Sequence, residues 1–195
     1  DIIGGVNYSG SLLKPYKNNR CVWLQYEAGN FRSDFKFSDE GWSIVVPHDG
    51  DLYGATAGTY GTTYHSRHSS FDDGYIYSYN LGSGVYYWAS SLFIGDASSS
   101  YGGSLFFRIK GNKPTSATNI VGYDVMIESS DGDIIGINID IPDTDDWINY
   151  SIPIDVNAGW KISSYSGTFL DTPWLDPLEQ DIINVLSNIS RILIR

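Results

Sequence analysis

Apolar and polar residues alternate with a period of two along much of this chain. The clearest stretch is 135–141, where isoleucine fills every odd position and Gly, Asn and Asp fill the even ones. Successive side chains of a β-strand point to opposite faces, so this alternation predicts strands with one buried face. The same pattern recurs at Phe35 and Phe37, at Trp42, Ile44 and Val46, at Leu105, Phe107 and Ile109, at Tyr123, Val125 and Ile127, and at Ile148, Tyr150, Ile152 and Ile154.

Turn-forming residues lie between these segments, as in Ser-Asp-Gly-Asp at 130–133, Pro-Asp-Thr-Asp-Asp at 142–146 and Asn-Ala-Gly at 157–159. Asp and Asn side chains bond to their own backbone in turns, and Gly adopts the backbone angles that tight turns require. About ten short strands separated by such turns predict an all-β protein, built as an antiparallel sandwich or barrel.

One segment near the C-terminal end of the sequence has a helical period instead. Its apolar residues recur at intervals of three and four, at Leu178, Ile182, Val185, Leu186 and Ile189. This spacing predicts one α-helix with Asp176 as its N-cap and Pro177 at its first position. The helix is followed by a strand-like ending at 191–195, which we expect to return into a sheet.

Two polar stretches, 47–73 and 163–175, show little alternation and carry Gly, Ser, Thr and aromatic residues. Long connections without regular structure are usually functional or mobile, so we expect ligand contacts there. The first part of the chain contains one plausible strand, at 21–27.

Composition narrows the class of partner. The chain has 195 residues and a formal net charge of -11, and aromatic residues make up 15% of it. A strongly acidic protein does not neutralise phosphates, so nucleic acid and anionic membranes are excluded as partners. The single cysteine, Cys21, forms no internal disulfide, and no apolar run has the length of a membrane span.

A series of short motifs follows in a fixed order. The two longest read Gly-Val-Tyr-Tyr-Trp-Ala-Ser-Ser-Leu-Phe-Ile-Gly-Asp at 84–96 and Ser-Tyr-Gly-Gly-Ser-Leu-Phe-Phe-Arg at 100–108. Others are Glu-Gly-Trp at 40–42, Trp-x-x-Tyr-x-Ile at 147–152, Gly-Trp at 159–160 and the closing helix and strand at 181–195. Together they resemble the laminin B family, also called laminin type IV or L4, over about residues 33–195.

The resemblance implies a jelly-roll β-sandwich at 33–195, similar to galactose-binding-like carbohydrate modules. We interpret residues 1–32, which it does not cover, as an N-terminal extension that contributes a strand. The resemblance also implies adhesion or ligand binding outside the cell, and no catalysis. Two features depart from the family: Ala-Ser-Ser at 89–91 stands where a proline is usual, and the flanking cysteine-rich modules of laminins are missing.

Aromatic residues in the two polar loops are the candidate ligand contacts. Sugar binding needs flat aromatic faces with polar groups nearby, and loop aromatics on a rigid scaffold can supply them. The alternative is that these rings only cover loop backbone. The strand tryptophans Trp42, Trp88 and Trp160 are predicted to lie in the core instead. The candidate ligand residues are Tyr53, Tyr60, Tyr64, Tyr165 and Trp174.

Acidic turns raise the question of a structural calcium ion. Calcium takes six to eight oxygen ligands, which clustered carboxylates and loop carbonyls can provide. Jelly-roll modules of the resembled kind often hold one such ion near the first strand, which makes Asp39, Glu40, Asp49 and Asp51 the candidate metal ligands. The alternative is that these acidic residues only form turns.

No nucleophile motif or metal cluster stands out, so we expect no enzymatic activity. The sequence therefore predicts a secreted or cell-surface recognition module that binds a polysaccharide or glycoconjugate. The alternative is a structural adhesion module with a protein partner. Three Asn-x-Ser sequons, at Asn7, Asn149 and Asn188, are potential N-glycosylation sites in a host that glycosylates secreted proteins.

Overall fold

The computed structural model describes residues 25–26, 33, 35, 38–46, 58–61, 63–65, 75–77, 86–111, 123–141, 144–164 and 173–195. These residues form twelve strands, two short 3-10 helices and one α-helix. The strands are β1 (Gln25–Tyr26), β2 (Ser43–Val46), β3 (Gly58–Gly61), β4 (Thr63–His65), β5 (Tyr75–Tyr77), β6 (Tyr86–Trp88), β7 (Ser104–Gly111), β8 (Val125–Ser129), β9 (Asp133–Ile137), β10 (Thr144–Pro153), β11 (Lys161–Ser164) and β12 (Ile189–Ile194). The helices are η1 (Ser91–Phe93), η2 (Ser98–Ser100) and α1 (Glu179–Ser187).

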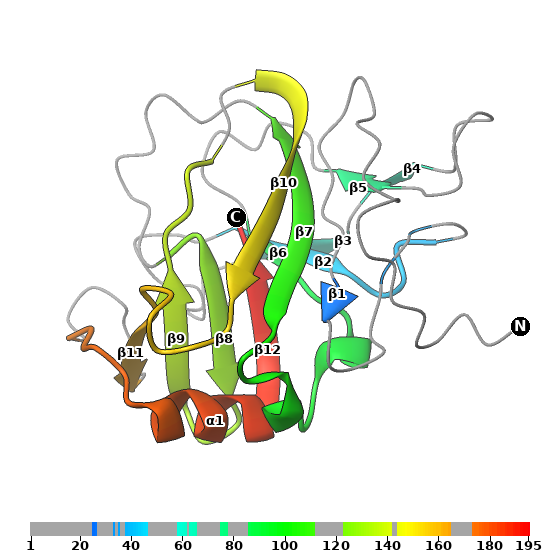
Figure 1. The fold of residues 1–195 in the computed structure, drawn as a ribbon. Coiled ribbons are helices and arrows are strands. Elements are labelled where there is room, and N and C mark those ends of the chain that lie inside the picture. Colours follow the sequence, from blue (N-terminus) through cyan, green and yellow to red (C-terminus); the bar gives the residue numbers. More distant parts are fainter. Residues whose placement is uncertain are drawn as a thin grey trace, which may run out of the picture.

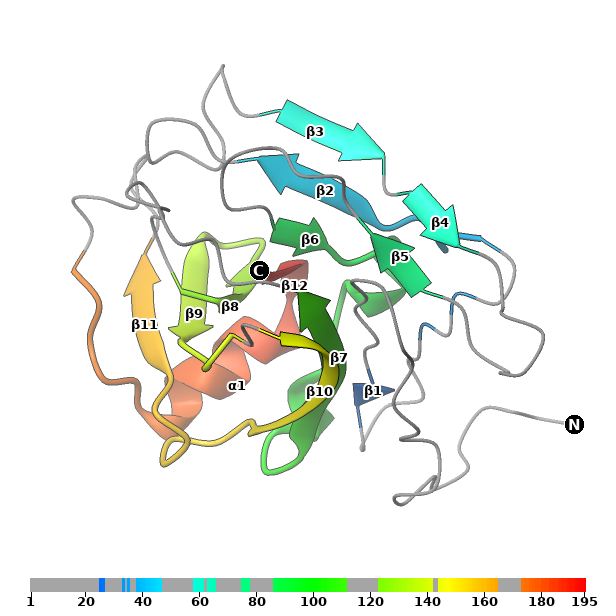
Figure 2. The ribbon, with the colours of Figure 1, turned by 90° about the horizontal axis from the view of Figure 1, so that it is seen from above.

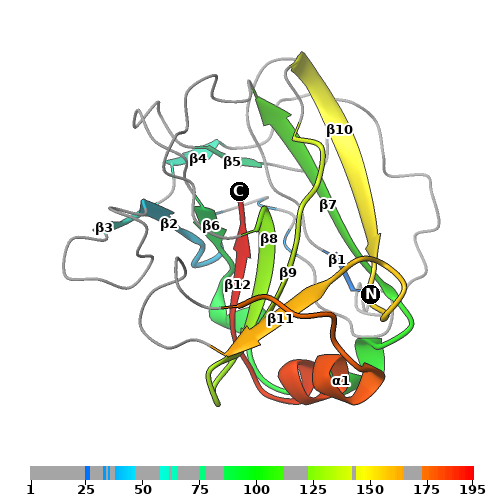
Figure 3. The same ribbon diagram turned by 90° about the vertical axis from the view of Figure 1, so that its left-hand side faces the viewer.

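The strands form two main antiparallel sheets. One has three strands in the order β1-β7-β10, and the other has seven in the order β11-β9-β8-β12-β6-β2-β3. Strands β4 and β5 pair separately. The two sheets face each other, and α1 closes one end of the space between them (Figures 1 and 3). This arrangement confirms the predicted β-sandwich with one C-terminal helix.

The core fills the space between the sheets. Its side chains come from every second position of the facing strands and from one face of α1. Trp42 and Trp160 are 2% and 1% exposed, as predicted, and their indole N–H groups donate to Ser33 Oγ and to the Pro153 carbonyl, both at 2.8 Å. These hydrogen bonds stabilise the two rings in the core, since an unpaired buried indole N–H costs free energy.

Three predictions of local structure were wrong. Phe35 is not in a strand: it has a left-handed φ of 50° and a fully buried side chain. The stretch 47–73, expected to lack strands, contains β3 and β4, which pair with β2 and β5. Backbone pairing needs no apolar alternation, so polar edge strands give no periodic signal. Trp88, predicted to lie in the core, is only half-buried.

The helix begins later than predicted. Its N-cap is Leu178, and Asp176 and Pro177 precede it. The Leu178 N–H donates to the Asp181 carboxylate at 2.8 Å, which satisfies one free donor at the helix start. Asp176 instead forms an ion pair with Lys161, so it does not cap the helix.

Candidate functional site

The outer face of the seven-stranded sheet, the face turned away from the core, is itself apolar. A second hydrophobic cluster lies there, which we call the outer cluster: Val45, Tyr86, Met126, Ile134 and Leu193. Each of these side chains is at most 2% exposed. Because β8 also contributes to the core, it is buried on both faces, in contrast to the predicted half-buried strand.

Strand register places a row of residues across this outer face. The row consists of Ser43, Trp88, Leu193, Met126, Gly136 and Lys161, each opposite the next on the neighbouring strand. Tyr123 covers the row at Gly136, where an added Cβ would lie only 2.7 Å from the Tyr123 ring. The missing side chain at Gly136 therefore gives Tyr123 its place beside Lys161.

The segment 173–178 extends the sheet beyond β11. Leu175 and Ile162 exchange both backbone hydrogen bonds, each 2.8 Å long. The neighbouring Trp174 packs its ring edge-on against Tyr123, with 4.5 Å between centroids and 67° between planes. Trp174 is partly buried against the outer cluster.

Large aliphatic side chains of the same segment face solvent. Leu175 is 62% exposed and Leu178 is 72% exposed. Between them, Asp176 pairs with the Lys161 ammonium, and the hydrogen bond and charge of Asp176 raise the pKa of Lys161. We call this group of residues the edge site: Tyr123, Lys161, Trp174, Leu175, Asp176 and Leu178.

Farther along the outer face, Trp88 is covered by a cation. The Arg191 guanidinium lies 4.4 Å from the Trp88 ring centroid, and Arg191 Nε lies 3.4 Å from Glu128 Oε2. This stacking with a charged partner fixes the guanidinium over the ring. The Arg191 side chain therefore covers this face of the Trp88 ring, so the face is not open to a ligand.

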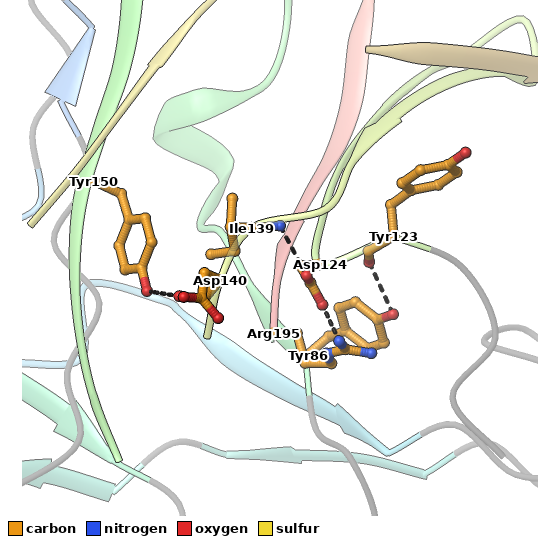
Figure 4. Close-up of polar contacts among 7 residues, drawn as sticks. All are labelled: Tyr86, Tyr123, Asp124, Ile139, Asp140, Tyr150 and Arg195. Atoms are coloured by element: carbon orange, nitrogen blue, oxygen red, sulfur yellow. Dashed lines mark hydrogen bonds and ion pairs between the residues drawn. The ribbon is translucent and has the colours of Figure 1, made fainter. Parts of the chain in front are cut away.

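A network of polar contacts lies beside Tyr123 and includes its backbone carbonyl (Figure 4). The Tyr86 hydroxyl donates to the Tyr123 carbonyl at 2.9 Å, and burial raises the pKa of Tyr86. Asp124, 3% exposed, pairs with Arg195 and accepts the Ile139 N–H at 2.8 Å. The Asp124 carboxylate therefore joins the residues just before β8 to Ile139, which follows β9, and to Arg195, which follows β12.

Tyr150 belongs to the same end of the sandwich. Its hydroxyl donates to the Asp140 carbonyl, and its ring stacks on Phe107 with centroids 5.1 Å apart. Burial, followed by the charges of Asp140 and Asp124, raises the pKa of Tyr150 to about 12. The Tyr150 hydroxyl is therefore neutral throughout the physiological pH range and already donates a hydrogen bond. We interpret it as a structural group.

The predicted ligand residues are only partly placed. Trp174 lies in the edge site. Tyr60 and Tyr64 lie in β3 and β4, opposite Ile44 and Ile76. Two others, Tyr53 and Tyr165, lie outside the described residues. The sequence reasoning missed Tyr123 and Leu178 as surface residues, because alternation assigned the first to a buried strand face and helical spacing assigned the second to the core.

The predicted metal ligands Asp39 and Glu40 form the turn before β2. Asp39 Oδ1 accepts the Gly41 N–H at 3.0 Å, and Glu40 Oε1 accepts the Phe35 N–H at 2.7 Å. Asp49 and Asp51 lie outside the described residues. Within the described ranges, no three His, Cys, Asp or Glu side chains come together. Two carboxylates fall short of the six to eight oxygens that calcium takes.

The geometry defines a β-sandwich domain with an aromatic and aliphatic surface at one sheet edge. A family model for laminin B (domain IV) matches residues 86–195, more than half of the chain. The chain therefore belongs to the laminin B family. No curated protein matches the chain in sequence.

Comparison with solved structures agrees with the fold. The chain is similar to the L4b domain of human laminin alpha-2, with a TM-score of 0.51 and 16% sequence identity, covering 80% of this chain and 81% of that one. At this identity the likeness concerns the fold alone. Among the described residues, no helix has the length and apolar character that crossing a membrane requires.

Proposed function

We propose that this chain is a secreted or cell-surface adhesion module that binds a protein partner through the edge site. One observation carries the proposal: Leu175 and Leu178, 62% and 72% exposed, lie in one short segment, and Trp174 immediately precedes Leu175. A single exposed leucine is ordinary on a protein surface. Two within four residues, beside a Trp and an ion pair, resemble the anchors and polar rim of a protein interface.

Binding of a polysaccharide or glycoconjugate is the second candidate. Trp174 and Tyr123 offer aromatic rings, and Lys161 and Asp176 offer hydrogen-bonding groups beside them. A sugar stacks on an open, flat ring face. The 67° angle between the two rings gives no shared platform, which favours the protein partner over the glycan.

The deciding experiment measures binding of the full chain to two panels, purified matrix proteins with their glycans removed and polysaccharides. Leu178→Ser is the test variant, because Leu178 is exposed and its side chain supports no core contact. Leu92→Ser is the matched control, because Leu92 is also exposed, at 52%, but lies in η1 outside the edge site.

Capture of a deglycosylated matrix protein that is lost in Leu178→Ser and kept in Leu92→Ser supports the proposal. Retention on a polysaccharide that is lost in Trp174→Ala and kept in Leu178→Ser supports the glycan instead. Protein capture that survives Leu178→Ser and Trp174→Ala overturns the assignment to the edge site.

A structural calcium ion is a separate proposal. Asp39 and Glu40 lie in a tight turn, with φ of 52° at Glu40 and 79° at Gly41, and place two consecutive carboxylates just before β2. They would need further oxygens, for which Asp49 and Asp51 are the candidates. Calcium should then raise the thermal midpoint relative to chelator, and the difference should vanish in Asp49→Asn/Asp51→Asn. Equal midpoints with calcium and chelator contradict this.

A further inference from the structure

Two of the three Asn-x-Ser sequons lie among the described residues, in different surroundings. The first, at 149–151, lies within β10. The second, at 188–190, spans the junction between α1 and β12. Asn7 lies outside the described residues.

The sequon at 188–190 is committed to structural hydrogen bonds. The Asn188 side-chain amide donates to Ser130 Oγ, and the Asn188 carbonyl accepts the Ser130 N–H at 2.9 Å. The Ser190 hydroxyl donates to the Glu128 carbonyl at 3.2 Å. A glycan on this amide would separate the end of α1 from the β8–β9 turn.

The Asn and Ser of the sequon at 149–151 form no such side-chain hydrogen bonds with the described residues. Asn149 and Ser151 are both exposed, and neither side chain forms a hydrogen bond with another of the described residues. Tyr150, between them, stacks on Phe107 in the core, so alternation directs its two neighbours away from the core. Strand β10 is also the outermost strand of its sheet, with β7 on one side only (Figure 2).

We propose that Asn149 is the acceptor of an N-linked oligosaccharide when the chain passes through a glycosylating secretory pathway. The proposal rests on the extracellular location proposed above. Sequons are acceptors where they are accessible on the surface of a secreted protein, and Asn149 meets that condition. Asn188 does not.

The reaction is a group transfer from a lipid-diphosphate-linked oligosaccharide, the donor that the host supplies. The Asn149 Nδ2 attacks the anomeric carbon of the donor sugar. A C–N bond forms as the C–O bond to the diphosphate breaks, and the lipid diphosphate leaves with the proton that Nδ2 loses. The Ser151 hydroxyl completes the sequon that the host transferase recognises.

A glycan at this position would also protect the free edge of β10. Strand β10, ten residues long, is outermost in its sheet among the described strands, and such an edge invites pairing with another chain. A bulky hydrophilic group on β10 obstructs that approach. The edge site lies beside β11 in the other sheet, so the glycan and the binding surface occupy different sheets.

The test is expression of the full chain behind a secretory signal in glycosylating cells. Peptides are then mapped by mass spectrometry after enzymatic glycan removal, which converts an occupied Asn to Asp. We expect conversion at 149 and none at 188. In a chain that also carries Asn7→Gln, so that the third sequon gives no signal, the gel shift on glycan removal should disappear in Asn149→Gln and in Ser151→Ala, and remain in Asn188→Gln.

Folded, secreted chain with unconverted Asn149, or conversion at 188 instead, overturns the proposal. If a variant is retained inside the cell, the same mapping is applied to its microsomal fraction, because transfer precedes secretion. An unconverted Asn149 there has the same meaning. Since the added signal imposes the location, failure here leaves the binding proposal intact, and failure of matrix binding leaves this one intact.

Discussion

The Asp124 carboxylate and the Arg195 guanidinium form an ion pair at one end of the sheet, beside the ends of two neighbouring strands. Asp124 precedes β8, Arg195 follows β12, and the Arg195 N–H donates to the Asp124 carbonyl at 2.8 Å. Side-chain and backbone contacts thus join the same two residues. Their side chains are 4% and 16% exposed, so the pair lies largely out of water.

Removing the acid of this pair should be strongly destabilising. Asp124→Asn leaves the Arg195 charge buried without its counter-ion, and breaking a buried pair from one side costs about 3–5 kcal/mol. The free energy of unfolding from urea denaturation measures the loss. A loss no larger than that of a surface variant would show that water solvates Arg195.

The matched control is the exposed pair of Lys161 and Asp176. The Asp176 side chain is 86% exposed, so water and salt screen its charge. Asp176→Asn should leave the urea midpoint nearly unchanged, in clear contrast with Asp124→Asn.

Gly136→Ala should destabilise the outer face. The new Cβ would lie 2.7 Å from Tyr123 Cδ2 and 2.8 Å from its Cβ and Cγ. Such overpacking costs about 1–3 kcal/mol. Tyr123→Ala removes the clash, so the double variant Gly136→Ala/Tyr123→Ala should lose less stability than the sum of the two single changes. Additive losses would mean that Gly136 is required for a reason other than Tyr123.

Stability should fall at alkaline pH. Burial raises the pKa of Tyr150 from 10.0 to about 12 in the folded chain, and it raises the pKa of Tyr86 as well. Between pH 10 and 12 the unfolded chain loses these protons first, so rising pH favours unfolding, and the stabilisation present below pH 10 is lost. Tyr150→Phe should reduce the slope of unfolding free energy against pH in this window. An unchanged slope contradicts the assignment to Tyr150.

Leu178→Ser should stabilise the helix while it weakens partner binding. Leu178 is the N-cap of α1 and has no side-chain oxygen, whereas a Ser hydroxyl at an N-cap accepts a free N–H of the first turn. The gain is about 1 kcal/mol. If the thermal midpoint rises while partner binding weakens, the weaker binding is due to the lost Leu178 contact and not to unfolding. A lower midpoint would show that the Leu178 side chain is part of the packing.

The sequence predicted the helices and strands that bury only one of their faces. Strand β7 and helix α1 face a single core, so Leu105 and Phe107, and Ile182 and Val185, stand at regular intervals. The family motifs also place Trp42 and Trp160 correctly, because large aromatic residues in matched strand positions are buried. The β-sandwich and its C-terminal helix follow from these regularities.

The edge site could not be predicted in the same way. Tyr123 and Trp174 are far apart in the sequence and meet only because Gly136 leaves room above β9. Periodicity reports which side of one element is apolar, and it does not report which elements become neighbours. The same limit applies to Met126, because alternation in 123–127 places it on the polar face of the strand, whereas a second hydrophobic cluster covers that face.

Strand β12 lies between β8 and β6 and pairs with both. Among the described strands, β12 is the one through which β6, β2 and β3 pair into the same sheet as β8, β9 and β11. The two parts of the sheet are therefore joined through contacts between residues about a hundred positions apart, such as Trp88 and Leu193. A truncation that removes β12 should therefore divide the seven-stranded sheet into two smaller sheets, and the strand edges that it exposes would invite pairing with other chains.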